Sequence, residues 1–272
     1  MFMNSTNKTL YIPLYGKSLV SQKGIILSDP KAEEIWQKEQ FPLKGKPKSK
    51  WLAYYMGMRA WVFDRWTEEQ LKSQPDSIVL HLGCGLDSRC LRVKAADQQW
   101  YDVDMPQVAE LRRQYYAENE RYHIIGCDVL EESWLKALPD AEHAIVVMEG
   151  LSMYLPLPQL QDLFRRLEQK FPQISLITDA YTEFGVRASA WKNPIQSVGA
   201  TVCTGIDEPQ LLNCGTLTFR TRLCMTPEEK IQELKGFEQR FFRLMFAEKP
   251  ATPSTEFIPM ERNNIWINKN RV

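Results

Sequence analysis

Two glycines and a downstream acidic residue have the types and spacing that point most directly to chemistry. Gly83 and Gly85 follow a short apolar run that begins at Ser77. Because glycine has no Cβ and adopts positive φ freely, a ligand can lie against the backbone there. Asp104 stands 21 residues after Gly83 and ends a second predicted strand. A carboxylate at that spacing accepts hydrogen bonds from ribose hydroxyls, so the pattern predicts a nucleoside site.

The residue at position 88 restricts which nucleosides we expect this site to bind. The dinucleotide fingerprint G-x-G-x-x-G needs a third glycine, which lets helix and strand pack closely around a pyrophosphate. Ser88 stands there instead. We therefore expect a nucleoside without a pyrophosphate, and S-adenosylmethionine (SAM) is the obvious one. An NAD-binding oxidoreductase, which the glycine turn and Asp104 would also suit, is the less favoured alternative.

The elements that must position these residues alternate between short apolar strands and helices. This alternation predicts an α/β fold with a doubly wound, mostly parallel sheet that is covered on both faces. The predicted strands are 77–82, 99–104, 122–127, 143–149 and 173–179, and the predicted helices between them are 88–95, 106–119, 133–138 and 157–171.

Ligands of such sheets bind outside the carboxyl ends of the strands. Asp128 could meet the exocyclic amine of adenine there, or it could be an ordinary loop or N-cap carboxylate. Glu149 closes an apolar strand, where an ionisable group is costly unless it is paired or reaches solvent, and it could hold the amino group or sulfonium side of SAM. Tyr154 could face the methyl-donor region, where an aromatic ring attracts a cation, or pack in the core. The strand-end candidates are Gly83, Gly85, Asp104, Asp128, Glu149 and Asp179.

We expect a single domain that is built from four parts. In the N-terminal part, Asp29-Pro30 begins a helix and 51–72 has a helical pattern, whereas 9–21 is mixed and interrupted by Pro13 and Gly16. The parts are an N-terminal helical cap (1–72), a SAM-binding core (77–181), a lid or insert (182–215), and C-terminal strands at 216–224 and 265–267 with one helix over 226–246 (216–272).

The remaining ionisable residues give weaker signals. Arg59 lies beside the apolar stripe of the helix at 51–72, and the pattern alone favours an exposed or snorkelling side chain. The histidines, His81, His123 and His143, lie within or beside predicted strands, so we expect core or surface positions away from the ligand face. No combination of nucleophile and base is evident.

Bulk properties exclude several classes of function. The formal net charge is zero, so bulk charge predicts no binding to nucleic acid or anionic membranes. Six cysteines without a C-x-x-C pair suit neither a zinc site nor a disulfide framework, and we expect no metal and reduced thiols in a cytoplasmic protein. Residues 1–17 form no apolar signal core and no run approaches 18 apolar residues, so no membrane span is predicted.

Four motifs in a fixed order resemble one known family. They are Gly83-x-Gly85-x-Asp87-Ser88-Arg89, Trp100-x-x-Val-Asp104-x-Pro106-x-Val108, Cys127-Asp128 with Trp134, and Glu149-Gly150-x-x-x-Tyr154-Leu155. Together they resemble the leucine carboxyl methyltransferase family, and more closely its bacterial branch of tetracenomycin-type polyketide O-methyltransferases. The resemblance covers about residues 9 to 270.

The resemblance implies a class I SAM-dependent methyltransferase with a seven-stranded Rossmann-like sheet, which releases S-adenosylhomocysteine. Under it, Arg59 pairs with the SAM carboxylate, which replaces the exposed position favoured above, and Lys17 approaches the same group. It also implies that Gly83 and Gly85 line the SAM turn, Asp104 binds the ribose, Asp128 and Val129 flank adenine, and Glu149 and Tyr154 lie near the methionine portion and the acceptor.

The expected reaction is methyl transfer to a carboxylate or hydroxyl of a small molecule, polyketide-like or another metabolite. The cofactor supplies the activated group and the protein mainly aligns the acceptor. A carboxylate needs no general base, and the scarcity of histidine favours carboxylates or easily ionised phenols. A non-catalytic SAM-binding regulator is the alternative, and the acceptor and the oligomeric state are left open.

Overall fold

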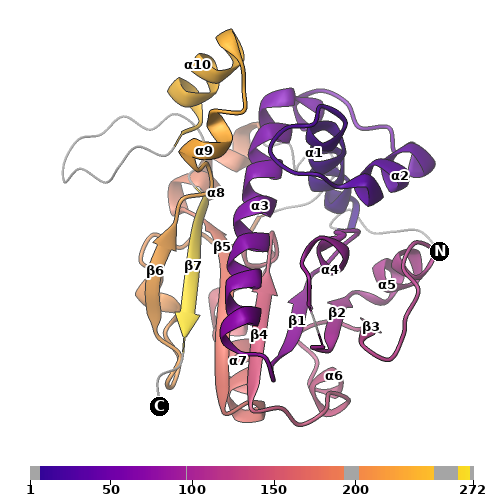
Figure 1. Cartoon of the computed structure of the whole chain (residues 1–272). Helices are drawn as coiled ribbons and strands as arrows, with labels where there is room; N and C mark the ends of the chain where they lie inside the picture. Colours follow the sequence, from indigo (N-terminus) through magenta and orange to yellow (C-terminus); the bar gives the residue numbers. More distant parts are fainter. Residues whose placement is uncertain (1–6, 96, 193–201, 248–262, 270–272) are drawn as a thin grey trace.

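The computed structural model describes residues 7–95, 97–192, 202–247 and 263–269. The framework is a seven-stranded sheet in the order β3-β2-β1-β4-β5-β7-β6 (Figure 1). Strands β1 to β5 are mutually parallel, and β7 runs antiparallel to both β5 and β6. The strands are β1 Ile78–Leu82, β2 Trp100–Asp104, β3 Tyr122–Gly126, β4 His143–Met148, β5 Gln173–Tyr181, β6 Phe219–Leu223 and β7 Asn263–Lys269. The doubly wound, mostly parallel sheet predicted from the sequence is confirmed.

Helices cover both faces of this sheet, as the apolar character of the strands requires. In β1, Leu80 and Leu82 pack with residues of α6 and α7, whereas Val79 packs with residues of α3. Figure 1 shows α3 crossing one face while α7 lies behind the other. The helices of the core are α3 Lys50–Ser73, α4 Arg89–Arg92, α5 Pro106–Arg113, α6 Ser133–Lys136 and α7 Leu157–Lys170.

The N-terminal part contains a helix that the sequence pattern did not predict, α1 (Tyr11–Gln22). Pro13 is tolerated because it lies in the first turn, where backbone N–H groups have no intrahelical partner. Gly16 marks a close contact between helices, since a Cβ there would meet Met56 Cβ at 2.7 Å. The other N-terminal elements are η1 Asn7–Leu10, α2 Pro30–Glu39 and η2 Lys46–Lys48.

Several predicted helices are shorter or divided. The helix predicted over 88–95 is the four-residue α4, and the one predicted over 106–119 ends at Arg113. The single helix predicted over 226–246 is wrong: one helix ends at Ile231 and the next begins at Gly236, whose φ of +57° does not fit within a continuous helix. The remaining elements are η3 Ser152–Tyr154, α8 Glu183–Lys192, η5 Pro209–Leu212, α9 Glu228–Ile231 and α10 Gly236–Met245.

Part of the predicted lid (193–201) and of the predicted C-terminal part (248–262 and 270–272) lies outside the described residues. Within the described ranges, no helix combines the length and the apolar character needed to cross a bilayer.

Candidate active site

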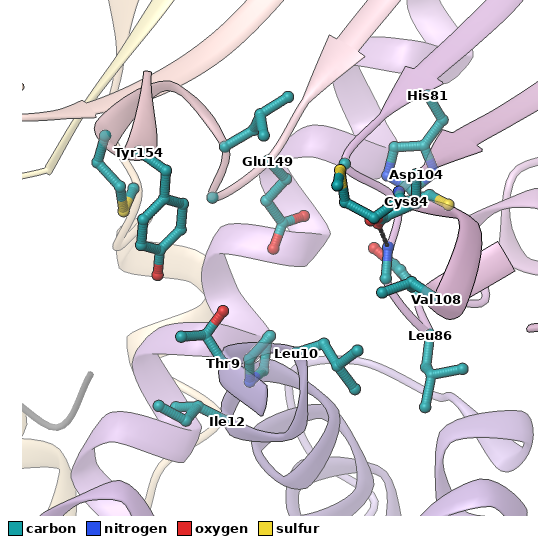
Figure 2. A pocket seen from close by; sticks show the side chains of 18 of the residues that line it. Thr9, Leu10, Ile12, His81, Cys84, Leu86, Asp104, Val108, Glu149 and Tyr154 are labelled. Carbon is teal, nitrogen blue, oxygen red and sulfur yellow. Dashed lines mark hydrogen bonds between the residues drawn. The ribbon is translucent and has the colours of Figure 1, made fainter. Parts of the chain in front are cut away.

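A cavity of about 410 Å³ opens at the carboxyl ends of β1, β2 and β4, beneath α1 and α3. Figure 2 shows Glu149 pointing into it, with Tyr154 on one side, Asp104 on the other, and Thr9, Leu10 and Ile12 facing it from the N-terminal helices. Of the ten residues selected from the sequence, Asp179 does not line this cavity. The nine that do are Lys17, Arg59, Gly83, Gly85, Asp104, Asp128, Val129, Glu149 and Tyr154.

The glycine turn and Asp104 form one end of the cavity, here called the nucleoside end. Gly83 and Gly85 have φ of +66° and +54°, which side chains rarely adopt. The Asp104 carboxylate accepts the N–H of Gly85 at 2.7 Å and that of Met105 at 2.8 Å. Burial raises the pKa of Asp104 to about 6, although these two hydrogen bonds favour the charged form. The turn therefore holds an acceptor of unusual basicity in place.

The residues that follow the glycine turn form hydrogen bonds and ion pairs with the N-terminal helices. These contacts explain why a polar residue, and not a third glycine, stands at position 88. Ser88 donates a hydrogen bond to Asp29, the N-cap of α2. Asp87 pairs with Lys17 of α1 at 3.0 Å. Arg89 pairs with Asp64 of α3 at 2.8 Å. Asp87, Ser88 and Arg89 thus connect the glycine turn, on one side of the cavity, to the helices α1, α2 and α3 on the other.

Glu149 and Arg59 form the opposite end of the cavity, here called the methionine end. Arg59 Nη2 lies 2.9 Å from Glu149 Oε1, and Arg89 also pairs with Glu149. Burial alone would raise the pKa of Glu149, but the two guanidinium groups outweigh it and bring that pKa to about 2. Lys17 is 2% exposed and lines the same end.

Arg59 is only 5% exposed, so the exposed position that its sequence pattern alone favoured is wrong. Two carboxylates, Glu149 and Asp179, neutralise it beneath α3, which makes its burial tolerable. The resemblance had already placed this side chain inward, and the structure agrees on its burial.

His81 lies in the cavity wall, although the sequence pattern placed it away from the ligand face. Its Nε2 lies 3.1 Å from Arg89 Nη1, and its Nδ1 lies 3.0 Å from Asp102. Because arginine only donates, Nε2 accepts and Nδ1–H donates to Asp102. Burial lowers the pKa of His81, so this imidazole is neutral and both of its nitrogens are occupied. It links the ion pairs of β2 to those of the methionine end.

The remaining wall is largely apolar and was missed from the sequence. Leu52, Met56 and Arg59 are spaced i, i+4 and i+7 on α3, so the helical period could have identified the first two. Tyr154, on η3, lies beside them, and burial raises its pKa to about 12. Apolar side chains of this part of the wall include Leu10, Ile12, Leu52, Met56, Met153, Leu155 and Tyr181.

Asp128 and Val129 lie beyond Asp104, where β3 ends. Asp128 Oδ1 accepts the N–H of Leu130 at 2.9 Å, which is the loop-capping role left open above. The carboxylate still lines the cavity, so the two interpretations are compatible.

Comparisons with known proteins agree with this architecture. Residues 4–168 match the family model for leucine carboxyl methyltransferases. The chain is 32% identical, over 77% of its length and 78% of the relative, to the tetracenomycin polyketide synthesis O-methyltransferase TcmP of Streptomyces glaucescens. It is 28% identical, over 61% of each chain, to the S-adenosyl-L-methionine-dependent methyltransferase dpfgK of Gibberella zeae.

A solved structure of similar fold is that of a DUF574-family protein from Streptomyces avermitilis. It shares 12% identity at a TM-score of 0.59, covering 89% of this chain and 90% of that one. With the family model, the relatives and the fold in agreement, the chain belongs to the leucine carboxyl methyltransferase family and is a SAM-dependent methyltransferase.

Proposed function

We propose that this protein transfers the methyl group of SAM to an oxygen atom of a small molecule, either a carboxylate or an easily ionised hydroxyl. The observation that carries the proposal is one cavity with a polar cofactor half and an apolar half. Among the described residues at its methionine end and along its apolar wall, no carboxylate, imidazole or phenol is suited to deprotonate a weakly acidic alcohol, and Asp104, the more basic carboxylate, lies at the nucleoside end. The name of the first relative, an O-methyltransferase of polyketide synthesis, supports transfer to oxygen, and the name of the second supports SAM-dependent methyl transfer.

The residues present fit SAM at both ends. At the nucleoside end, Asp104 accepts the ribose hydroxyls, the open Gly83 and Gly85 backbone lies along the ligand, and Asp128 and Val129 flank adenine. Each Asp104 oxygen already takes one backbone N–H, and each still has a lone pair for a ribose hydroxyl.

At the methionine end, Arg59 and Lys17 supply positive charge for the SAM carboxylate, and Glu149 supplies negative charge for its ammonium or sulfonium. A guanidinium matches a carboxylate geometrically. Because the pKa of Glu149 is about 2, its side chain is a fixed anion at any physiological pH. We assign it to cofactor binding and electrostatic support rather than to proton transfer.

The groups in the cavity wall restrict the acceptor. Glu149 is too weak a base, His81 has both nitrogens engaged, and Tyr154 keeps its proton because its pKa is about 12. A general base works best when its pKa lies near the operating pH. The acceptor must therefore arrive ionised or lose its proton easily, which favours carboxylates and acidic phenols.

When bound, SAM supplies a methyl group on a positively charged sulfur, already activated for displacement. The chain's own contribution is alignment. Arg59, Lys17 and Asp104 hold the two ends of the cofactor, and the apolar wall around Met56 and Tyr154 orients the acceptor and excludes water.

We also propose that the segment 182–215 shapes the acceptor side. The Thr204 hydroxyl donates to the Leu155 carbonyl at 2.6 Å, and the Cys203 N–H donates to the Met153 carbonyl at 2.9 Å. These bonds join Cys203 and Thr204 of that segment to η3, which carries Tyr154, and to the residue after it. No disulfide joins the six cysteines, all of which lie in the described ranges. This fits a reducing compartment, and we place the reaction in the cytoplasm.

The test is transfer of a labelled methyl group from SAM into a metabolite extract of the source cell, followed by mass spectrometry. Mild alkali then separates the two acceptor classes, because a methyl ester releases labelled methanol and a phenol ether retains its label. Heat-inactivated protein is the control. If calorimetry shows that SAM binds and no metabolite acquires label, the non-catalytic regulator replaces this proposal.

A further inference from the structure

Asp179, near the end of β5, is a buried carboxylate that lies behind the wall of the cavity. Its side chain is fully buried. Its Oδ2 accepts Arg59 Nη1 at 2.9 Å, and its Oδ1 accepts the N–H of Gly150 at 2.6 Å. Both partners line the cavity, whereas Asp179 is not among the lining residues.

The two partners of Asp179 also lie close to each other. Gly150 has φ +73°, and a Cβ built on it would lie 3.6 Å from both terminal nitrogens of Arg59. The guanidinium therefore lies over the turn that follows Glu149. Glu149 holds Nε and Nη2 of the guanidinium, and Asp179, with one oxygen on each of its partners, holds Nη1 at this turn.

The charge of Asp179 also affects the net charge of the ion-pair network around the methionine end. Ion pairs connect nine buried residues around the methionine end into one network with four cations and five carboxylates, so a single negative charge is in excess when all are ionised. SAM carries a net positive charge because of its sulfonium, and S-adenosylhomocysteine is neutral overall. The network comprises Lys17, Arg59, Arg89, Arg92, Asp29, Asp64, Asp87, Glu149 and Asp179.

We propose that Asp179 is a positioning residue for the methionine end of SAM: it holds Arg59 against the Gly150 turn and supplies the excess negative charge that favours the sulfonium over the thioether product. The inference rests on the proposed placement of the methionine end at Arg59. Burial raises the pKa of Asp179 although Arg59 lowers it, which fits a carboxylate whose charge is incompletely balanced in the free protein.

The test compares Asp179→Asn with Asp29→Asn by calorimetry against SAM, S-adenosylhomocysteine and adenosine. Both variants remove one carboxylate charge from the same network, but Asp29 pairs with Arg92 and caps α2, away from Arg59. For Asp179→Asn we expect SAM affinity to fall about tenfold or more, the product's affinity to fall less, and adenosine affinity to stay unchanged. Because no ion pair joins Asp29 directly to Arg59, Asp29→Asn should change the ratio of SAM to product affinity less than Asp179→Asn does.

Two outcomes would overturn the inference. One is an Asp179→Asn variant with wild-type affinity for SAM. The other is an equal loss for all three ligands, which marks a purely structural role. If Asp179→Asn does not fold, the wild-type protein still tests the charge argument. An analogue with an ammonium group in place of the sulfonium must then bind more tightly than S-adenosylhomocysteine, and equal or weaker binding rejects it.

Arg59→Lys, measured alongside, separates this inference from the placement on which it rests. A loss for SAM and its product, with adenosine unaffected, supports the methionine end at Arg59. Unchanged affinities for all three ligands overturn that placement and the inference together. A weakened Arg59→Lys with an unaffected Asp179→Asn overturns the role of Asp179 alone.

Discussion

The two ends of the cavity are built on different physical principles. At the nucleoside end, the backbone determines the geometry. Two positive-φ glycines open the turn, and backbone N–H groups hold Asp104 in place. At the methionine end, side chains from α1, α3, β5 and the turn after β4 converge in an ion-pair network. Accordingly, the pKa of Asp104 at the nucleoside end is about 6, and the pKa of Glu149 at the methionine end is about 2.

Because of this difference, the two ends are vulnerable to different changes, the nucleoside end to protonation and the methionine end to mutation. The nucleoside end can lose its charge by taking up a proton, yet its geometry survives because backbone hydrogen bonds hold it. At the methionine end, Glu149 and its two arginines keep their charges across the physiological range, but removal of one partner leaves the others with an uncompensated buried charge. Mutations and pH should therefore affect the two ends in opposite ways.

The largest effect is expected for Arg59→Ala. Glu149 and Asp179 would lose their shared cation in a buried site, so we expect the free energy of unfolding to fall by about 3–5 kcal/mol. SAM binding should be lost with it. Urea denaturation measures the first effect and calorimetry the second. A loss in stability comparable to that of an exposed pair, below about 1 kcal/mol, would show that water replaces the arginine and that the network is not a tightly packed unit.

Asp104→Ala should have a smaller and different effect. The ribose hydroxyls lose their acceptor, and we expect SAM binding to weaken by about 1.5–3 kcal/mol, the usual value for hydrogen bonds to a charged group. Adenosine should lose the same amount, because it carries the same ribose. Calorimetry with both ligands checks this. A loss for SAM that adenosine does not share would move Asp104 away from the ribose.

The pH dependence of adenosine binding tests the nucleoside end separately from the methionine end. The pKa of Asp104 is raised to about 6, so the carboxyl is protonated below that pH and no longer offers its charged acceptor. Adenosine affinity should thus be full above pH 6 and fall below it, by roughly tenfold at pH 5 relative to pH 7. Titration of Asp104→Asn is the control and should be flat. A wild-type protein with pH-independent adenosine affinity would contradict the assignment.

The sequence predicted where the glycine turn and Asp104 lie, because this part of the cavity is built from residues close together in the chain. The glycine turn and Asp104 lie on consecutive strands, and their chemistry depends on spacing along the chain. The sheet could be predicted for the same reason, since each buried strand is a short apolar run between turn residues.

The methionine end depends on contacts between distant residues, and periodicity cannot show these. Arg59 is 120 residues from Asp179 in the chain, and its burial follows from that pairing rather than from its place on the helix. His81 was misplaced because its partners, Arg89 and Asp102, become neighbours only when the sheet forms. The helix α1 was missed because Pro13 and Gly16 break the pattern, although one sits in the first turn and the other serves helix packing.

The smallest effect is expected at Tyr154, outside both ends. Its pKa of about 12 keeps the phenol neutral, so it cannot act as the base, and its hydroxyl can contribute only a neutral hydrogen bond. Tyr154→Phe should leave SAM affinity unchanged and lower kcat less than about tenfold, since such a bond is worth roughly 0.5–1.5 kcal/mol. Calorimetry and methyl-transfer kinetics on the acceptor found in the labelling experiment measure both quantities. A loss of kcat beyond about a hundredfold with normal SAM binding exceeds what one neutral hydrogen bond can supply, and it would make Tyr154 a catalytic residue.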